Sequence, residues 1–323
     1  MAGIVVAGTT LVDKINEVKK YPKAGELEKI ISQTMAVGGC VPNDSVDMKK
    51  IAPSLNVYAL AKIGRDADGE FIKSFLESAG VNTDMVMYSD TAKTSFTDVI
   101  SIAGGERTFF TYAGADSELG FEDIDFDAID AEMFHLGYFL LLDRIDKGDG
   151  VLILKELVKR GIKTSIDLVS ENGDRYKCVL PCLEYTDNLI VNEIEAGKLA
   201  DIEPTDENIK AICQKLLDLG VRERVIIHKP DFAVCLAKNG EFTFVPSYEL
   251  PEGFIKGATG AGDAFCSGSL IKIYQGESDR AILEFGSACA VMALSEKDAV
   301  SGLRTEEEIK EFCKGWKRKN ICL

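Results

Sequence analysis

The sequence GATGAGDAFCSGSL, from Gly257 to Leu270, crowds four glycines around a single carboxylate, Asp263, and continues into a small, apolar, helix-like run. Glycine-rich turns at the start of a helix bind phosphate groups through exposed N–H groups and the helix dipole. A Walker loop would continue with a lysine, whereas Gly262 is followed by Asp263 and Ala264. A dinucleotide-binding turn would follow the first strand, whereas this turn lies late in the chain. The stretch therefore predicts an anion hole with a carboxylate at its edge.

A carboxylate beside phosphate groups is costly unless it takes part in the chemistry. Asp263 is therefore predicted to be a general base, which removes the proton of an alcohol while the alcohol oxygen attacks a γ-phosphoryl group. The amides around Gly260 to Gly262 would stabilise the charge on the transferred group. The alternative is an aspartate that only caps a helix after a flexible turn.

The chain has 323 residues, of which 46% are hydrophobic and 28% charged, as is typical of one large α/β domain or two modest ones. Its net charge of −16 argues against nucleic acid as a partner, and any phosphate site must be built locally from amides and a few cations. Nine cysteines form no C-x-x-C pair and only His135 and His228 occur, so we expect reduced thiols and little material for a zinc cluster. The first residues are typical of a strand, and no apolar run is long enough for a membrane span. We expect a cytoplasmic protein without a membrane partner.

Short apolar runs alternate with helical patterns along the chain, and glycine closes several of the helices, at Gly80, Gly161 and Gly220. Strand candidates follow two of these helices, at residues 162–168 and 224–228. Steady alternation of strand and helix predicts a parallel sheet that is covered on both faces.

Two segments, about 11–37 and 92–115, depart from this strand–helix alternation. Their apolar and polar residues alternate with a period of two, and they carry too much charge for buried parallel strands. They predict a small antiparallel sheet outside the main domain, with a hairpin turn near Gly104 and Gly105. Such a sheet would project over the carboxyl ends of the parallel strands, where ligands bind, and would act as a lid. Since no linker or repeat divides the sequence, residues 1–323 are expected to form one domain with this lid.

The stretch TGAGDAFCSG resembles the C-terminal signature of the ribokinase-like, PfkB-type carbohydrate kinases, usually D-T-x-G-A-G-D-x-F, and the resemblance covers most of the chain. VGGCVPN is similar to the family's G-G-x-x-x-N motif, KIGRDADGEF to G-x-D-x-x-G-x-F, GERTFFTYAGAD to the lid hairpin and VNEIEA to N-x-x-E. The resemblance implies a ribokinase-like α/β fold, with a three-layer, doubly wound, mostly parallel sheet and a small β-sheet lid. It also implies a homodimer in which two lids pair.

The resemblance implies a role for each residue that matches a motif. Asp263 would be the catalytic base, with Gly260, Ala261 and Gly262 forming the anion hole. The acceptor would be bound by Asp13, Gly38, Gly39, Asn43 and Arg107. ATP would be bound by Asn192, Glu195 and Thr259, with Glu195 acting on Mg²⁺ through water. Lys229 matches no motif, but it is a further candidate that would supply a cation to ATP. For Arg107, on the lid, solvation or a cross-strand ion pair is the alternative interpretation.

Other residues of this set also have simpler structural interpretations. An aspartate at a strand end, such as Asp13, is a common turn residue, and the Gly38-Gly39 pair is typical of a hinge. Asn192 and Glu195 fit a capping box at the start of a helix, an interpretation compatible with a role in binding. An Asp and an Asn together can bind vicinal diols, because one accepts two O–H donors and the other both donates and accepts.

The sequence departs from the family pattern at three places. After the strand RVIIH the chain continues HKPDFAV, with Lys229 and Phe232 where the family carries glycines, and His228 is typical of a structural histidine. The family's D-x-N-x-R run is altered to DLVSENGDR from Asp167. Gly257 stands where the family carries an aspartate that helps to hold potassium.

The residues and the resemblance together predict an ATP- and Mg²⁺-dependent kinase that phosphorylates a primary hydroxyl of a sugar or sugar-like compound. Two alternatives stay open. A nucleoside kinase of the same fold would use Asp13 and Asn43 on the ribose diol. A sugar- or nucleoside-binding protein without catalysis is suggested by the altered loop at Lys229 and Phe232.

Overall fold

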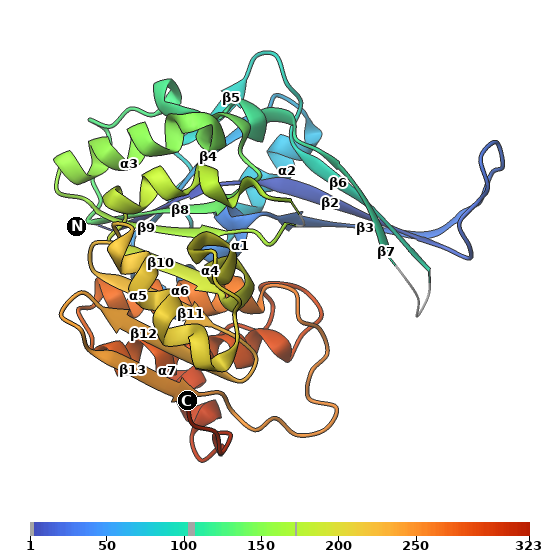
Figure 1. The fold of residues 1–323 in the computed structure, drawn as a ribbon. Coiled ribbons are helices and arrows are strands. Elements are labelled where there is room, and N and C mark those ends of the chain that lie inside the picture. The colour runs from blue at the N-terminus through green and yellow to red at the C-terminus, as the bar shows by residue number, and fades with distance from the viewer. Residues whose placement is uncertain (1–2, 103–106, 172) are drawn as a thin grey trace.

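A nine-stranded sheet forms the centre of the computed structural model, which describes residues 3–102, 107–171 and 173–323 (Figure 1). In spatial order the strands are β13 (Phe242–Pro246), β12 (Phe232–Ala237), β11 (Arg224–His228), β10 (Asn188–Asn192), β9 (Lys163–Leu168), β8 (Met133–Phe139), β1 (Ile4–Gly8), β4 (Val57–Gly64) and β5 (Val86–Ser89). The strands from β11 to β5 are parallel, and β12 and β13 are antiparallel additions at one edge. The predicted strands at 162–168 and 224–228 correspond to β9 and β11.

Helices cover both faces of this sheet because alternate residues of its strands face opposite hydrophobic cores. In β1, Ile4 and Val6 belong to one core, and Val5 and Ala7 belong to the other. The first core is covered by α1 (Cys40–Ile51), α2 (Ala67–Ser78), α6 (Ala261–Tyr274), α7 (Asp279–Leu294) and α8 (Glu306–Cys313). The second core is covered by α3 (Gly150–Lys159), α4 (Glu193–Ala200) and α5 (Ile209–Asp218). The predicted three-layer α/β architecture is confirmed.

Short helical turns connect these layers. They are the 3-10 helices Gly114–Glu118, Phe121–Asp123, Arg175–Cys178, Leu180–Tyr185 and Asp206–Asn208, and the π-helical turn Ile145–Asp149. Gly80, Gly161 and Gly220 follow α2, α3 and α5 in left-handed or related conformations, with φ of 79°, 74° and 127°. These values confirm that glycine ends the three helices, because side chains rarely adopt a positive φ.

The strand order reverses at β1, which lies between β4 on one side and β8 on the other. The chain therefore builds one half of the sheet outward through β4 and the other half outward through β8. Parallel sheets bind ligands at such a reversal, beyond the carboxyl ends of the strands. The loops that follow β1 and β8 are thus expected to border the site.

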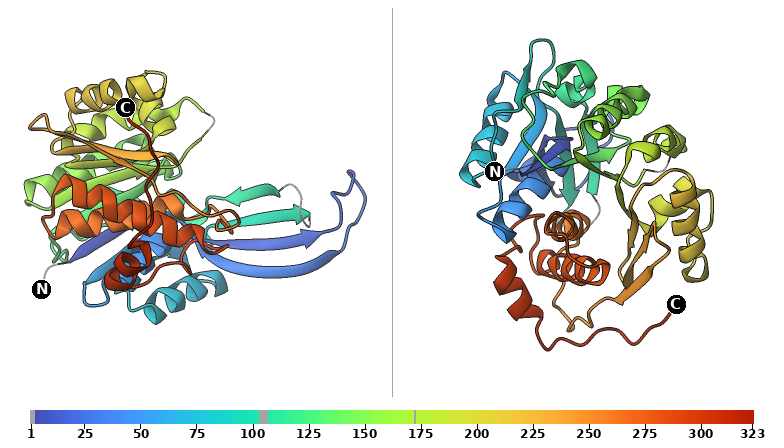
Figure 2. Two further views of the ribbon diagram at one scale, coloured as in Figure 1. Left: turned by 90° about the horizontal axis from the view of Figure 1, so that it is seen from below. Right: turned by 90° about the vertical axis from the view of Figure 1, so that its left-hand side faces the viewer.

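Four strands form a second sheet, which extends from the main body as an arm (Figures 1 and 2). They are, in spatial order, β3 (Ile30–Gly38), β2 (Leu11–Val18), β6 (Phe96–Ile102) and β7 (Arg107–Tyr112). The outer pairs β2–β3 and β6–β7 are antiparallel as expected, whereas the middle pair β2–β6 is parallel. The predicted turn at Gly104 and Gly105 lies outside the described residues. Within the described part of the chain, no helix has the length and apolar character that a membrane crossing requires.

Candidate active site

Asp263 lies in the first turn of α6, and the N–H groups of this turn have no partner within the helix; the Ala261 N–H donates to the Ala258 carbonyl oxygen over 3.4 Å. The helix begins after Gly260, whose φ is 77°, and Asp263 is 6% exposed. A Cβ atom at Gly260 would lie 2.5 Å from the Cα atom of Ala299, so both the backbone conformation and the space require glycine. The sequence thus places a tight turn, free amides and a buried carboxylate within four residues.

Two side chains hold the two carboxylate oxygens of Asp263. The Asn43 amide donates to Oδ2 over 2.8 Å, and the Tyr138 hydroxyl donates to Oδ1 over 2.7 Å. Burial raises the pKa of Asp263 to about 6, while the hydrogen bonds from Tyr138 and Asn43 act in the opposite direction. A carboxylate accepts about four hydrogen bonds, so Asp263 retains capacity for another donor such as an alcohol.

The predicted acceptor residues connect to Asp263 through the start of α1. Gly39 precedes this helix with a φ of 95°, and its carbonyl oxygen accepts from the Asn43 N–H over 3.2 Å. A Cβ atom at Gly38 would lie 2.7 Å from Oδ2 of Asp13, so the glycine allows the Asp13 carboxylate to lie directly against the backbone. Burial raises the pKa of Asp13 from its ordinary value. The structure therefore brings Asp13, Gly38, Gly39, Asn43 and Asp263 into one connected group.

A cavity of about 190 Å³ lies beside Asp263 and extends toward the start of α4. Its described lining includes Gly260 and Gly262 on one side and Asn192 and Glu195 on the other. The predicted anion hole and the predicted N-x-x-E pair thus share one cavity, although the two motifs lie far apart in the sequence.

Asn192 and Glu195 form a capping box at the start of α4. The Asn192 side chain accepts from the N–H groups of Ile194 and Glu195, and the Asn192 N–H donates to Glu195 over 3.1 Å. Ser170 donates to the other oxygen of Glu195 over 2.8 Å. Burial raises the pKa of Glu195 to about 7. The capping interpretation is confirmed, and it leaves both side chains on the cavity wall.

The remaining predicted residues lie in different surroundings. The His228 ring packs on Phe265 with ring centres 4.7 Å apart and lines the cavity, and burial lowers its pKa to about 4. Lys229 forms an ion pair with Asp206 over 2.6 Å and does not belong to the described cavity lining. Thr259 is exposed just before the α6 turn, and Arg107 is exposed at the start of β7.

Three residues at this site were missed from the sequence. Tyr138 is the direct partner of Asp263, and it has a φ of 57° at the carboxyl end of β8. Asp167 lines the cavity at the end of β9 and accepts from the Tyr138 N–H over 2.6 Å. Ser170 connects Asn192 to Glu195. These residues could have been found as polar residues at or just after the predicted parallel strands, because the carboxyl ends of such strands meet at one edge of the sheet.

Comparison with known proteins identifies the family to which this fold and site belong. A family model described as pfkB family carbohydrate kinase matches residues 1–306. The chain belongs to the pfkB family of carbohydrate kinases. The resemblance inferred from TGAGDAFCSG is confirmed, and the protein is a carbohydrate kinase.

Individual pfkB relatives agree over nearly the whole chain. Ribokinase from Arabidopsis thaliana is 25% identical over 316 residues, which cover 96% of this chain and 81% of the relative. A structure of Arabidopsis thaliana ribokinase complexed with ribose and ATP has a TM-score of 0.85 at 22% identity and covers 97% of this chain and 99% of that one. A nucleoside kinase from Methanocaldococcus jannaschii has a TM-score of 0.76 at 20% identity, with coverage of 96% and 97%. At such identities the solved structures show a shared fold, and this fold is common to sugar and nucleoside kinases.

Proposed function

We propose that this carbohydrate kinase transfers the γ-phosphoryl group of ATP to a primary hydroxyl of a sugar or sugar-like acceptor, with Asp263 as the general base. The observation that carries this proposal is the position of a buried carboxylate directly beside the free amides of α6. The N–H groups at a helix N-terminus stabilise the negative charge of the transferred phosphoryl group, and the carboxylate accepts the proton of the attacking alcohol. Both groups are thus within reach of one reacting centre.

The proposed step is an in-line displacement in which the bond from the acceptor oxygen to phosphorus forms and the bond from phosphorus to the leaving ADP oxygen breaks. The acceptor's hydroxyl proton moves to Asp263, whose carboxylate is ionised above its pKa of about 6. The amides of Gly260 to Gly262 stabilise the charge on the transferred group. Asn43 and Tyr138 hold the carboxylate in place through the two hydrogen bonds to its oxygens.

Mg²⁺ fits the oxygen-rich wall of the cavity. Glu195 and Asn192 supply carboxylate and amide oxygens there, which are the donors that this ion prefers, directly or through water. When bound, Mg²⁺ would neutralise charge on the phosphate oxygens of ATP. Glu195 is already ordered by Ser170 and the Asn192 N–H, so it is positioned before a ligand arrives.

Acceptor hydroxyls are assigned to Asp13, Gly38, Gly39 and Asn43, which connect to Asp263 through α1. A ribose diol of a nucleoside would suit Asp13 and Asn43 as well as a free sugar would. An assay of ATP consumption across sugars and nucleosides, with Asp263→Asn as the matched control, tests the proposal. Turnover confined to nucleosides would support the nucleoside kinase alternative. Binding of a panel compound without any turnover would support the non-catalytic alternative.

The lid supports a proposed homodimer. Ile30 and Ile31 are 54% and 53% exposed, and Phe109 and Phe110 are each 61% exposed. Since neighbouring strand residues point to opposite faces, the lid displays apolar surface on both faces. One face would cover the acceptor and the other would pack on a second lid. The variants Phe109→Lys and Phe110→Lys test this arrangement. Light scattering should find that one of the two variants is monomeric, and a binding measurement should find that the other binds the acceptor more weakly. A monomeric wild-type protein would contradict the dimer.

A further inference from the structure

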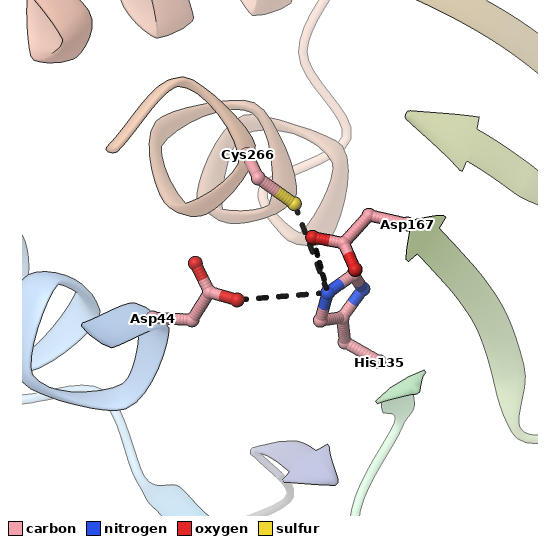
Figure 3. A group of neighbouring side chains, drawn as sticks. All are labelled: Asp44, His135, Asp167 and Cys266. Carbon is pink, nitrogen blue, oxygen red and sulfur yellow. Dashed lines mark hydrogen bonds and ion pairs between the residues drawn. The ribbon is translucent and has the colours of Figure 1, made fainter. Parts of the chain in front are cut away.

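Four potential metal ligands converge in the core behind Asp263 (Figure 3). His135 comes from β8, Asp44 from α1, Asp167 from β9 and Cys266 from α6, and all four residues are buried. Their ligand atoms lie within 4.8 Å of one another. The sequence offers no local metal-binding motif, because the four residues come from four separate elements that meet only in the folded chain.

The two carboxylates near Nε2 of His135 lie farther away than hydrogen-bonded groups would, whereas the Cys266 sulfur lies within the distance of a weak hydrogen bond to sulfur. The Nε2 atom lies 3.6 Å from Oδ2 of Asp44, 3.7 Å from Oδ2 of Asp167 and 3.8 Å from Sγ of Cys266. A hydrogen bond between nitrogen and oxygen would hold the atoms about 2.7 to 3.2 Å apart. Two ligands of one tetrahedral zinc ion lie roughly 3.3 to 3.7 Å apart, as follows from bond lengths of about 2.0 to 2.3 Å. The distances from Nε2 thus match shared coordination to within a few tenths of an ångström.

Other hydrogen bonds hold the ligand side chains in orientation. Ser165 contacts Nδ1 of His135 at 2.9 Å, which leaves Nε2 directed toward the cluster. Ser267 donates to Oδ1 of Asp44 over 2.9 Å, and the Tyr138 N–H donates to Oδ1 of Asp167 over 2.6 Å. Secondary contacts of this kind orient the ligands of protein metal sites and select the histidine tautomer.

The second oxygen of Asp44 provides independent support. Oδ2 is completely buried, faces the cluster and has no hydrogen-bond partner among the described residues. A buried carboxylate oxygen without a partner is costly, and Asp167 and Asp263 place further negative charge nearby. A cation among these groups would remove the cost.

We propose that Asp44, His135, Asp167 and Cys266 bind a zinc-class divalent metal ion. Imidazole, thiolate and carboxylate together favour such an ion over Mg²⁺, which prefers oxygen ligands alone. Binding forms four bonds to the metal and releases the Cys266 thiol proton to solvent, so no redox change is needed. Asp167 and Cys266 also line the cavity, which gives the ion a path to the site. The bound ion would fix α1, α6, β8 and β9 against one another directly behind the general base.

Titration with Co²⁺ tests this site, because a tetrahedral thiolate-bound Co²⁺ absorbs strongly in the visible range and shows a sulfur-to-metal band in the near ultraviolet. The metal-free protein should carry Cys322→Ser, which removes an exposed thiol. We expect one equivalent of Co²⁺ to produce both absorptions, and Zn²⁺ to displace it. In this background Cys266→Ser should lose the sulfur band, and Asp44→Asn should weaken Co²⁺ binding by about 10-fold or more. The matched control is Cys213→Ser, which replaces a buried cysteine in α5. It should change neither the sulfur-to-metal band nor the affinity for Co²⁺.

Thermal unfolding supplies a second measurement that does not depend on kinase activity. Zn²⁺ should raise the Tm of the Cys322→Ser protein and of the Cys213→Ser control, and at the same Zn²⁺ concentration it should raise the Tm of Asp44→Asn by clearly less. If Cys266→Ser fails to fold, the sulfur band of the parent protein and the response of Asp44→Asn decide the question. Absence of the tetrahedral spectrum in the parent would overturn the site. A spectrum that survives both ligand substitutions would overturn it equally, and the four side chains would then form a proton-sharing network.

Discussion

Replacing Tyr138 with phenylalanine is expected to shift the acid limb of the activity profile to higher pH, because the Tyr138 hydroxyl donates directly to the proposed base. Its oxygen lies 2.7 Å from Oδ1 of Asp263. Burial raises the pKa of Asp263 to about 6 and the Tyr138 hydrogen bond lowers it, so the hydroxyl favours the ionised form. Phenylalanine keeps the ring and removes this donor alone.

The size of the shift follows from the energy of a hydrogen bond to a charged group. Such a bond contributes about 1.5 to 3 kcal/mol, and one pKa unit corresponds to about 1.4 kcal/mol. Loss of the bond should therefore raise the pKa of Asp263 by about 1 to 2 units. Since the base works only when ionised, activity near pH 6 should fall about 5- to 50-fold relative to the wild type. Well above the new pKa, activity should return close to the wild-type level.

The measurement is kcat/KM for the best acceptor between about pH 5 and 9, which reports the pKa values of the free enzyme. The protein should be freed of transition metals beforehand, so that Asp44, Asp167 and His135 affect Asp263 only through their own charges. Tyr248→Phe is the matched control, because its buried hydroxyl accepts from Arg318 and its ring lies outside the described cavity lining. An unshifted acid limb would refute the coupling of Tyr138 to Asp263. A uniform loss of kcat/KM at every pH would assign Tyr138 to substrate binding instead.

Three further predictions concern the proposed site. Asp263→Asn should lower kcat by roughly 10² to 10⁴-fold with little change in nucleotide affinity, and a variant with wild-type turnover would remove the base assignment. Asp13→Ala should weaken acceptor binding by about 1.5 to 3 kcal/mol and spare ATP binding, which calorimetry measures for both ligands. Turnover should be nearly indifferent to replacing potassium with a large organic cation at fixed ionic strength, because Gly257 has no side-chain oxygen and a Cβ there would lie 3.0 Å from the Glu296 carbonyl oxygen. Several-fold activation specific to potassium would contradict this last prediction.

Local sequence patterns were sufficient to predict most of the fold. Glycine at the helix ends and apolar strands between the helices predicted the covered parallel sheet, because both signals depend on neighbouring residues. Charged segments in which apolar and polar residues alternate predicted the second, smaller sheet. The parallel pairing of β2 with β6 could not be predicted, because the same alternation occurs in strands of either direction. The glycine-rich turn around Gly260 predicted the start of the helix whose first turn contains Asp263.

The predicted site was incomplete where contacts depend on the tertiary fold. Tyr138 carries no motif, and only the strand order together with its φ of 57° brings its hydroxyl to Asp263. The cluster around His135 could not be predicted, because its four residues come from separate segments and form no local motif. Asp44 and Cys266 lie on helices from opposite ends of the chain, and α1 packs on α6 only in the folded molecule.

The electrostatics of the cavity indicate how an acidic chain can hold a phosphate group. Among the described lining residues no lysine or arginine occurs, and Lys229, the nearest candidate from the sequence, is paired with Asp206. His228 has a pKa of about 4 and is therefore neutral near pH 7. Positive potential in the cavity would then come from the N–H groups at the start of α6, as the proposed function requires. The φ of 77° and the close approach of Ala299 require glycine at position 260, so a larger residue there would displace the turn that carries these N–H groups.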